Sequence, residues 1–402
     1  MRFGQDRASH DELILCGDGD EYTREVDTRT ALQVSILQIA TNLIADMIGC
    51  DRFRFSDAIE ILSVAKWSLQ VDNRTDMAKV CLFTNVERVA SALDMLGIED
   101  FRHARVPVKL HMGEPGNKYF VSPSTVKLIV QTLKAAGAEP FLFDTAVAYP
   151  GPRSTADGYR RVAHRHGFGE HDMGCEVVIG EEGVKIVECG YSFDVAKEIH
   201  KSTHLVVVSH VKGHLMTGFG GAIKNLGMGG VTKEMKRRIH HWSIPKLSAE
   251  KCDLCGSCAE VCPSDAITVN SEWRYDSAAC DGCGKCVSVC SSGALSHDIM
   301  DLQKGLALAT KACTSGKRTL YINALVNMSR NCDCDPNAGP IICPDIGYLA
   351  SNELAAVDRA SLDLINQVRP GVFEEIHGID PSEQVRYAEE IGLVSAYELG
   401  RL

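Results

Sequence analysis

Eight cysteines of this sequence fall into two runs with the same close spacing. Each run reads C-x2-C-x2-C-x3-C. Ferredoxin-type loops use this spacing to hold [4Fe-4S] clusters, and the fourth cysteine of each run binds the other cluster. The spacing therefore predicts one cluster on Cys252, Cys255, Cys258 and Cys290. It predicts a second cluster on Cys280, Cys283, Cys286 and Cys262.

Paired zinc sites are the alternative, because C-x-x-C pairs also bind zinc. Four cysteines within eleven residues, twice over, do not suit that geometry. The fourth cysteine of each run is also expected to start a helix, which would direct its thiol away from its own loop. We therefore favour two [4Fe-4S] clusters over zinc.

A second group of polar residues follows the apolar stretch 204–209, which is predicted to be a buried strand. It combines alternating His210, Lys212 and His214 with a glycine-rich loop that contains Gly220, Gly221, Lys224 and Asn225. Glycines let the backbone approach a ligand, and the N–H groups at a helix start favour an anion. The loop matches neither the Walker A nor the GxGxxG pattern.

These residues predict a ligand site, with a glycine-rich turn and solvated basic side chains as the alternative. We expect Lys212 and Lys224 to hold a small anion and a histidine, His210 or His214, to transfer protons. Gly220, Gly221 and Asn225 are expected to contact the ligand. The nearby basic helix around 233–241, with Lys236, His240 and His241, is interpreted as a solvent-exposed face.

Three further cysteines, Cys332, Cys334 and Cys343, lie close together beyond another predicted strand. In an extended chain a C-x-C pair projects both thiols to one side. The pattern allows a third metal site or a redox-active thiol cluster near the glycine-rich loop, although no fourth metal ligand is evident. Burial as unreactive core cysteines is the alternative.

The elements that must position these residues alternate between strand and helix. Predicted strands lie at 80–83, 106–111, 140–144, 177–179, 185–188, 204–209, 319–324 and near 347. Predicted helices lie at 87–96, 125–136, 155–166, 195–201, 298–313 and 353–366. This alternation predicts an α/β fold with a mostly parallel sheet and flanking helices.

The same pattern suggests the domain organisation. The α/β domain would comprise 77–246 and 298–370, interrupted by a two-cluster ferredoxin-like insertion at 247–297; three domains in series are the alternative. Residues 371–402 are expected to form a C-terminal helix and tail. Residues 1–76, with helical patterns at 29–49 and 56–69, read either as an accessory segment or as the result of a start codon assigned too early.

Composition limits the classes of partner. The net charge is −11 without a long basic run, so nucleic acid and anionic membranes are not expected as partners. No signal segment is recognised, and the stretch 31–49 reads as amphipathic rather than membrane-spanning. Seventeen cysteines alongside oxygen-sensitive clusters indicate a reducing, anaerobic or microaerobic cytoplasm.

Residues 78–368 resemble the uncharacterised Fe-S centre proteins, a prokaryotic family built on a domain of unknown function. The resemblance rests on Lys212-Gly213-His214, the 220–229 glycine-rich stretch, the eight cluster cysteines, Cys332-Asp333-Cys334 and Pro344-Asp345-Ile346-Gly347. The family usually continues Ser-x-Asp-Pro-Val-Ala-x-Asp. Here Glu353-Leu354 replaces the Asp-Pro pair, while Asp358 matches. The resemblance implies iron–sulfur binding and no assigned reaction.

Two functions follow from these features. The first is electron transfer through two [4Fe-4S] clusters, coupled to an α/β domain that binds a small anionic ligand or a redox partner. The alternative is a redox enzyme whose substrate binds at the loop between His210 and Lys224. A third interpretation, in which the clusters only stabilise the fold, is less favoured because an α/β domain of this size should not need them.

Overall fold

The computed structural model describes residues 77–402; the predictions for 1–76 lie outside the described residues. An eight-stranded sheet with the order β16-β1-β15-β14-β7-β2-β3-β4 forms its centre. Its strands are β1 (Ala78–Phe83), β2 (Arg105–Lys109), β3 (Glu139–Thr145), β4 (Val177–Gly180), β7 (His204–His210), β14 (Arg318–Leu325), β15 (Gly347–Ser351) and β16 (Tyr397–Arg401). Strand β15 is antiparallel to β1 and β14, and the other adjacent pairs are parallel. The predicted α/β fold with a mostly parallel sheet is confirmed.

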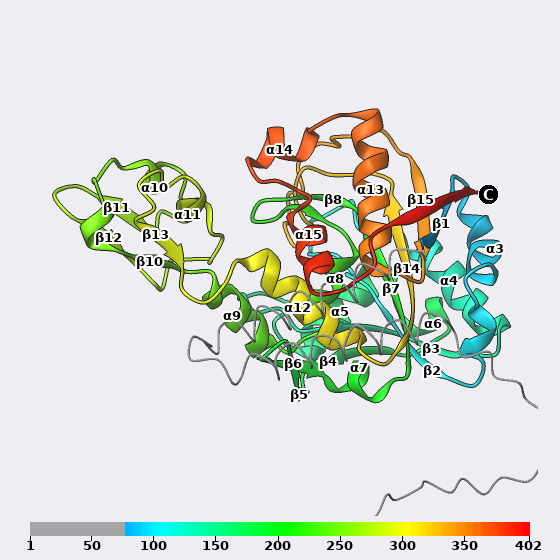
Figure 1. Ribbon diagram of the computed structural model, residues 1–402. Coiled ribbons are helices and arrows are strands. Elements are labelled where there is room, and N and C mark those ends of the chain that lie inside the picture. Colours follow the sequence, from blue (N-terminus) through cyan, green and yellow to red (C-terminus); the bar gives the residue numbers. More distant parts are fainter. Residues whose placement is uncertain (1–76) are drawn as a thin grey trace, which may run out of the picture. The chain divides into compact units, whose positions relative to one another are not determined.

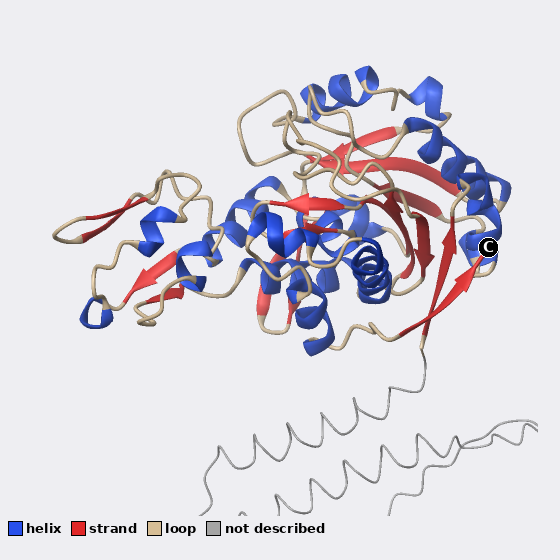
Figure 2. Cartoon of the chain, turned by 90° about the horizontal axis from the view of Figure 1, so that it is seen from above, coloured by secondary structure: helices blue, strands red, loops and turns tan. Residues whose placement is uncertain are grey.

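Helices cover both faces of this sheet (Figure 2). They are α3 (Val89–Asp94), α4 (Pro123–Ala135), α5 (Ala156–Arg165), α6 (Glu170–Met173), α7 (Lys197–Lys201), α8 (Ala222–Gly229), α9 (Lys233–Trp242), α12 (Leu302–Thr314), α13 (Leu354–Val368), α14 (Val372–His377) and α15 (Glu383–Glu390). Side-chain caps start several of them. Ser122 accepts the N–H of Thr125 at 3.1 Å ahead of α4, which satisfies a backbone donor that the helix itself leaves unpaired.

The central strand β7 shows why the sheet is buried on both sides. It lies beside β14 in the middle of the sheet (Figure 1). Leu205 and Val207 belong to the apolar core that includes α8, α9, α12 and α13, whereas Val206 and Val208 belong to the core that includes α3, α4 and α5. Successive strand side chains point to opposite faces, so an unbroken apolar run fits a strand between two helical layers.

Two parts of the α/β fold differ from the sequence-based prediction. The predicted helix at 195–201 is only α7, because the residues before it form β6 (Tyr191–Ala196) in a hairpin with β5 (Gly183–Glu188). The expected C-terminal tail contains α14, α15 and then β16, which pairs in parallel with β1. Backbone hydrogen bonding to an open sheet edge, which local sequence does not reveal, makes this tail a strand.

The segment 247–297 contains short elements with a small apolar core of its own. They are η4 (Ala249–Lys251), α10 (Ser257–Glu260), β11 (Ile267–Val269), β12 (Trp273–Tyr275), α11 (Lys285–Ser288) and β13 (Leu295–His297), with β10 (Pro245–Leu247) paired to β13. Strands of the large sheet come from both sides of this segment in the sequence. The third cysteine of each run, not the fourth, lies within the short helix, which corrects the expected helix start.

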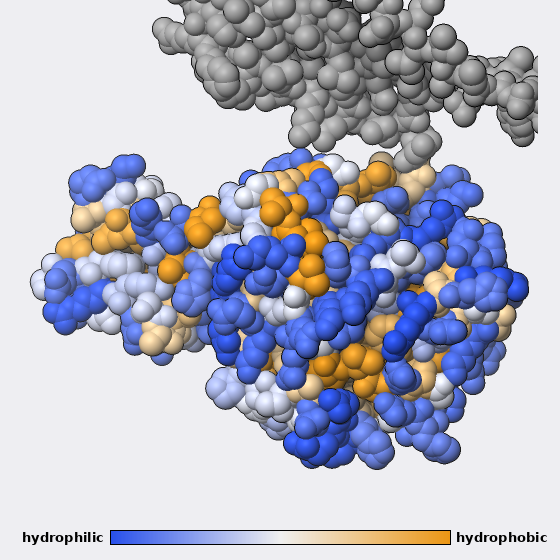
Figure 3. Space-filling model, turned by 90° about the horizontal axis from the view of Figure 1, so that it is seen from below, coloured by the Kyte–Doolittle hydropathy of each residue, from blue (hydrophilic) through white to orange (hydrophobic). Residues whose placement is uncertain are grey.

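The outer surface is mainly hydrophilic on the face shown in Figure 3, where hydrophobic side chains gather in separate patches. No helix among residues 77–402 combines the length and apolar character that a membrane span requires.

Candidate functional site

A cavity of about 220 Å³ lies where β2, β3 and β7 end. Lys109 is the last residue of β2, Asp144 lies at the end of β3, and Lys212 follows β7; all three line the cavity. The chain runs outward from β2 to β3 and β4 and then returns to the other side of β2 as β7. Ligands of open α/β sheets bind at such a reversal of strand order, outside the carboxyl ends of the strands.

Positive charge dominates the lining of this cavity. Its cationic side chains are Lys109, Lys212, Lys224, Lys236 and Arg153. The carboxylate that lines it, that of Asp144, forms an ion pair of 3.1 Å with Lys109, whose ammonium also donates to Asn225 at 2.7 Å. Buried charge is costly unless it is paired, so the surplus of cations favours an anionic ligand.

Arg153 is fully buried and forms the most extensive of these polar networks. It pairs with Glu114 at 2.7 Å, and its guanidinium lies 2.8 Å from His111 Nε2 and 3.1 Å from the hydroxyl of Tyr159. Tyr159 in turn donates to Asp144 at 2.5 Å. The network fixes the guanidinium on one side of the cavity. No feature of the sequence around Arg153 indicated this position.

Lys236 of α9 is buried, and no carboxylate among residues 77–402 forms an ion pair with it. Its ammonium donates to the backbone carbonyls of Thr145 at 3.1 Å and Ala146 at 2.8 Å. Burial lowers the pKa of Lys236 to about 7. The interpretation of this helix as a solvent-exposed face was therefore wrong for Lys236, and also for His240, which lines the cavity. It was right for His241, which is exposed.

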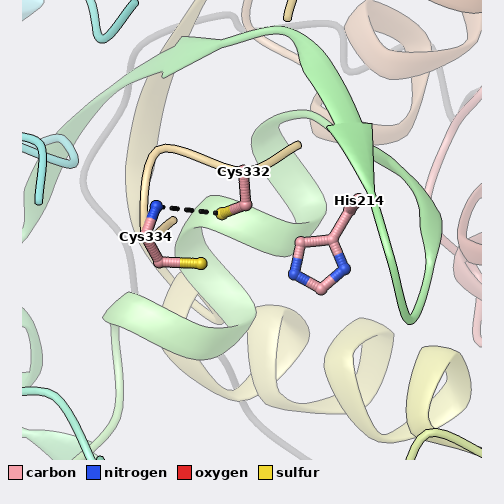
Figure 4. A group of neighbouring side chains, drawn as sticks. All are labelled: His214, Cys332 and Cys334. Atoms are coloured by element: carbon pink, nitrogen blue, oxygen red, sulfur yellow. Dashed lines mark hydrogen bonds between the residues drawn. The ribbon is translucent and has the colours of Figure 1, made fainter. Parts of the chain in front are cut away.

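Two thiols and an imidazole meet at the cavity wall. One ligand atom each from His214, Cys332 and Cys334 lies within 4.8 Å of the others (Figure 4). His214 ends β8 (Lys212–His214), which pairs with β9 (Gly218–Gly220), whereas both cysteines belong to the loop after β14. The predicted approach of the C-x-C pair to the glycine-rich loop is present in the structure.

The surroundings of Cys332 favour a thiolate. Its sulfur accepts the backbone N–H of Cys334 at 3.4 Å and lies 3.9 Å from the Lys224 ammonium. Hydrogen bonding from the Cys334 side chain holds the pKa of Cys332 well below its ordinary value despite burial, and Lys224 and His214 act in the same direction. The shared hydrogen bond to Cys332, together with burial, raises the pKa of Cys334. The surroundings therefore favour the thiolate form at Cys332 over Cys334.

Asp333 and His210 hold this loop in place. The Asp333 carboxylate lies 2.7 Å from His210 Nδ1 and 3.1 Å from the Lys212 ammonium. His210 Nε2 faces the carbonyls of Val326 at 3.0 Å and Asn327 at 3.2 Å. Lys212, His214 and Lys224 line the cavity as expected, but His210 does not, because its ring nitrogens are taken up by the loop. His210 is a positioning residue.

The glycine-rich loop does not offer its helix start to a ligand. Asp358 of α13 accepts the N–H groups of Ala222 at 2.7 Å and Ile223 at 2.8 Å. A Cβ at Gly221 would collide with that carboxylate. The expected contacts of Gly220 and Gly221 with the ligand are therefore corrected, since neither lines the cavity, whereas Asn225 does. The Asp358 carboxylate therefore occupies the position at the start of α8 that was predicted for the ligand anion.

Cys343 does not join the other two cysteines. It is buried in the apolar core that covers the α8 and α13 face, and it is outside the group formed by His214, Cys332 and Cys334. The expected convergence of three sulfurs is corrected to two sulfurs and an imidazole. The buried-cysteine alternative describes Cys343.

Four cysteines of the two runs, Cys258, Cys262, Cys286 and Cys290, belong to or pack against the small core of the 247–297 segment. One small cavity is lined by Cys252, Cys255, Cys258 and Cys290. In the second set, burial and then the proximity of Cys262 and Cys280 raise the pKa of Cys283. The cluster ligands themselves stay a prediction.

Several cavity residues were missed at the sequence level, namely Lys109, His111, Asp144, Arg153, Lys236 and His240. A signal existed for two of them. Lys109 and Asp144 are polar residues near the ends of apolar strands, where ligand sites form in α/β sheets. Lys236 and His240 belong to the basic helix that was interpreted as solvent-exposed, and His111 and Arg153 come from positions that only packing brings to the cavity.

Comparison with known proteins places the chain in a family. A family model described as "Domain of unknown function (DUF362)" matches residues 106–363, so the chain belongs to this family. No curated protein matches the sequence. The lactate racemase apoprotein from Thermoanaerobacterium thermosaccharolyticum is similar in structure, with a TM-score of 0.39 and 11% identity. The match covers 72% of this chain and 57% of that one, and a likeness of this degree indicates nothing about activity.

Proposed function

We propose that this protein is an iron–sulfur redox enzyme that acts on a small anionic substrate in the cationic cavity. Residues 252–290 would hold two [4Fe-4S] clusters, which when bound supply single electrons. An external low-potential electron-carrier protein would provide those electrons. Electron transfer to a partner, with the cavity serving only to bind a regulatory anion, is the competing function.

The arrangement of the cysteines supports clusters rather than single metal ions. Four thiolates around one zinc ion at ~2.3 Å would bring their sulfurs within about 4 Å of one another. Among residues 77–402, no set of the eight run cysteines forms such a compact group. Instead, Cys252, Cys255, Cys258 and Cys290 line a shared cavity, which is the set predicted for the first cluster.

The observation that carries the enzyme proposal is a contact between the second cysteine loop and α9. The Ser243 hydroxyl, just after α9, donates to the carbonyl of Gly282, between Cys280 and Cys283. A Cβ at Gly282 would collide with the carbonyl of His240. The same helix supplies Lys236 and His240 to the cavity. One short helix therefore links the loop predicted to hold the second cluster with the ligand cavity.

The cavity residues suit the handling of an anion and of protons. Lys224, Lys236 and Arg153 surround the space with positive charge, and the small volume excludes most water. Burial, with Lys224 nearby, lowers the pKa of both His214 and His240 to about 4, so both rings are neutral at pH 7. Nδ1 of His240 is buried and has no hydrogen-bond partner among the described residues. A neutral ring of this kind offers one nitrogen that accepts a proton or hydrogen bond and one N–H that donates a hydrogen bond to substrate.

The test is reoxidation of the reduced protein under anaerobic conditions. Protein loaded with iron and sulfide and reduced with dithionite would be mixed with nitrite, sulfite, fumarate, the dianion bis(carboxymethyl) disulfide or a neutral quinone. Cluster absorbance would be followed by stopped flow. We expect at least one anion to reoxidise the wild type faster than the Lys224→Gln variant by about tenfold or more, while the quinone does not distinguish them.

Lys246→Gln is the matched control, because Lys246 is exposed and does not line the cavity. Absence of iron and sulfide after reconstitution would refute the cluster component of the proposal. Equal reoxidation of wild type and Lys224→Gln by every anion would refute the enzyme component and leave electron transfer to a partner as the function.

A further inference from the structure

The orientation of the His214 ring indicates whether Cys332 and Cys334 bind a metal ion or act as a redox-active thiol pair. The backbone N–H of Met216 donates to His214 Nδ1 at 3.2 Å. A neutral imidazole that accepts at Nδ1 carries its proton on Nε2. The edge of the ring that carries Nε2 faces the two sulfurs (Figure 4). The ring therefore presents a hydrogen-bond donor to the sulfurs, whereas a metal ion would need a lone pair there.

The charges around Cys332 and Cys334 also favour thiol chemistry over metal binding. The Lys224 ammonium lies 3.9 Å from the Cys332 sulfur, and Lys212 pairs with Asp333 between the two cysteines. Such surroundings stabilise a thiolate and oppose the approach of an additional cation. The geometry is that of a nucleophilic thiolate with an adjacent thiol, held by a fixed loop.

The remaining lining limits the substrate. The cavity is smaller than the ~300–1,000 Å³ typical of drug-sized ligand pockets. Beside the cations it presents the apolar side chains of Val147, Met216, Met228, Leu302 and Leu306. A small anion with a short apolar portion matches this combination.

We propose that Cys332 and Cys334 form a thiol–disulfide exchange centre that reduces a small anionic disulfide. The proposal rests on the redox function above and names its substrate class. The Cys332 thiolate attacks one sulfur of the substrate R–S–S–R, which forms a Cys332 mixed disulfide and releases one R–S⁻. Cys334 then attacks the Cys332 sulfur, which releases the second R–S⁻ and leaves a Cys332–Cys334 disulfide.

One complete cycle of exchange and regeneration consumes two electrons and two protons per disulfide. His214 Nε2–H donates a hydrogen bond to the first leaving thiolate, and this thiolate takes the proton that Cys334 loses as it becomes the second attacking thiolate. The second leaving thiolate takes its proton from solvent. The Cys332–Cys334 disulfide is restored to the starting thiolate and thiol by two electrons and one proton. These electrons would be supplied singly by the external electron-carrier protein through the clusters that residues 252–290 are proposed to hold.

The test uses anaerobic, cluster-loaded full-length protein and two disulfides of matched length. Bis(carboxymethyl) disulfide is a dianion, and bis(2-hydroxyethyl) disulfide is neutral. In a single turnover without reductant, the wild type should release two thioglycolates per chain and form the internal disulfide, as peptide mapping by mass spectrometry would show. The dianion should react at least about tenfold faster than the neutral compound, and Lys224→Gln should remove this preference.

Cysteine variants separate the two roles. Cys334→Ser should stop at a mixed disulfide on Cys332 with one thioglycolate released, and Cys332→Ser should release none at this site. Cys343→Ser, which alters a buried cysteine outside the pair, should behave as wild type. Iron content and circular dichroism would verify that each variant is folded.

Three results would overturn the proposal: no adduct on Cys332 in Cys334→Ser, equal rates for the two disulfides, or a metal ion coordinated by the pair in X-ray absorption spectra. None of these depends on electron flow from the clusters. Failure of the exchange reaction is therefore distinguishable from failure of the proposed redox function, which the reoxidation experiment tests.

Discussion

The carboxylate of Asp358 caps α8 by accepting the backbone N–H of Ala222 at 2.7 Å, although the two residues lie far apart in the sequence. Asn323 of β14 donates to the same carboxylate at 2.7 Å, and Asp358 is fully buried. Helix α8 carries Lys224 and Asn225, so this cap positions one wall of the cavity. Burial raises the pKa of Asp358 to about 6, which leaves it ionised at neutral pH.

Replacing Asp358 with alanine should destabilise the protein strongly. The N–H groups of Ala222 and Ile223 and the amide of Asn323 would lose their acceptor, and each buried unpaired donor costs ~1–3 kcal/mol. We expect the free energy of unfolding to fall by about 3 kcal/mol or more in anaerobic urea titrations. Arg359→Ala, on the exposed side of the same helix, should change it by less than about 1 kcal/mol. Similar losses for both variants would contradict the capping role.

Gly282→Ala should disturb the contact between the second cysteine loop and α9 while leaving the loop able to bind iron. Gly282 has a φ of +65°, and Leu254, at the equivalent position of the first run, has a φ of +56°. A side chain is therefore compatible with this loop conformation, and the carbonyl of His240 is what excludes it. We expect full iron content. Reoxidation of the clusters by anions that bind in the cavity should slow by about tenfold, because electrons would have to cross a disrupted contact between the cysteine loop and α9.

Leu254→Ala is the matched control, because Leu254 is exposed and holds the equivalent position in the first cysteine run. If Gly282→Ala reoxidises at the wild-type rate, electrons do not reach the cavity through this contact.

Anion binding should weaken as the pH rises through about 7. Burial lowers the pKa of Lys236 to about 7, so its ammonium is present below that pH and is lost above it. His214 and His240, with pKa values lowered to about 4, stay neutral throughout this range. Calorimetric titration with sulfate between about pH 6 and pH 9 should show affinity falling by up to tenfold per unit of pH.

Lys236→Arg should flatten this dependence, because a guanidinium stays charged. Lys233→Arg, on the same helix but outside the cavity lining, should keep the wild-type profile. A profile that is unchanged in Lys236→Arg would assign the titration to another group.

Cys262→Ser should damage the second predicted cluster more than the first. Cys262 closes the first run, yet its proximity to Cys283 contributes to the raised pKa of that thiol. We expect iron content to fall by up to about half, with loss of one of two interacting paramagnetic signals in the reduced protein. Cys189→Ser, outside both runs, should leave both signals. Selective loss of the first cluster would reverse the ligand assignment.

The sequence by itself determined the features that are encoded locally. The alternation of apolar strands with amphipathic helices predicted the α/β class, because strand and helix periods depend on neighbouring residues. The run of Leu205 to Val208 predicted a strand buried on both faces, and both cores contain its side chains. The predicted cluster ligands likewise depend on cysteines that lie close together within each run. The convergence of Lys212, His214 and Lys224 followed from their position after a strand.

Only the tertiary structure decided which charges are buried and what they face. Lys236 and His241 belong to the same basic helix, and packing against the ends of other strands buries one and leaves the other exposed. Asp358 occupies the helix start where the glycine-rich loop predicted an anionic ligand. The order of strands in the sheet sets these neighbours. That order arises from contacts between residues distant in the sequence, whose energies depend on burial and pairing and therefore leave no local pattern.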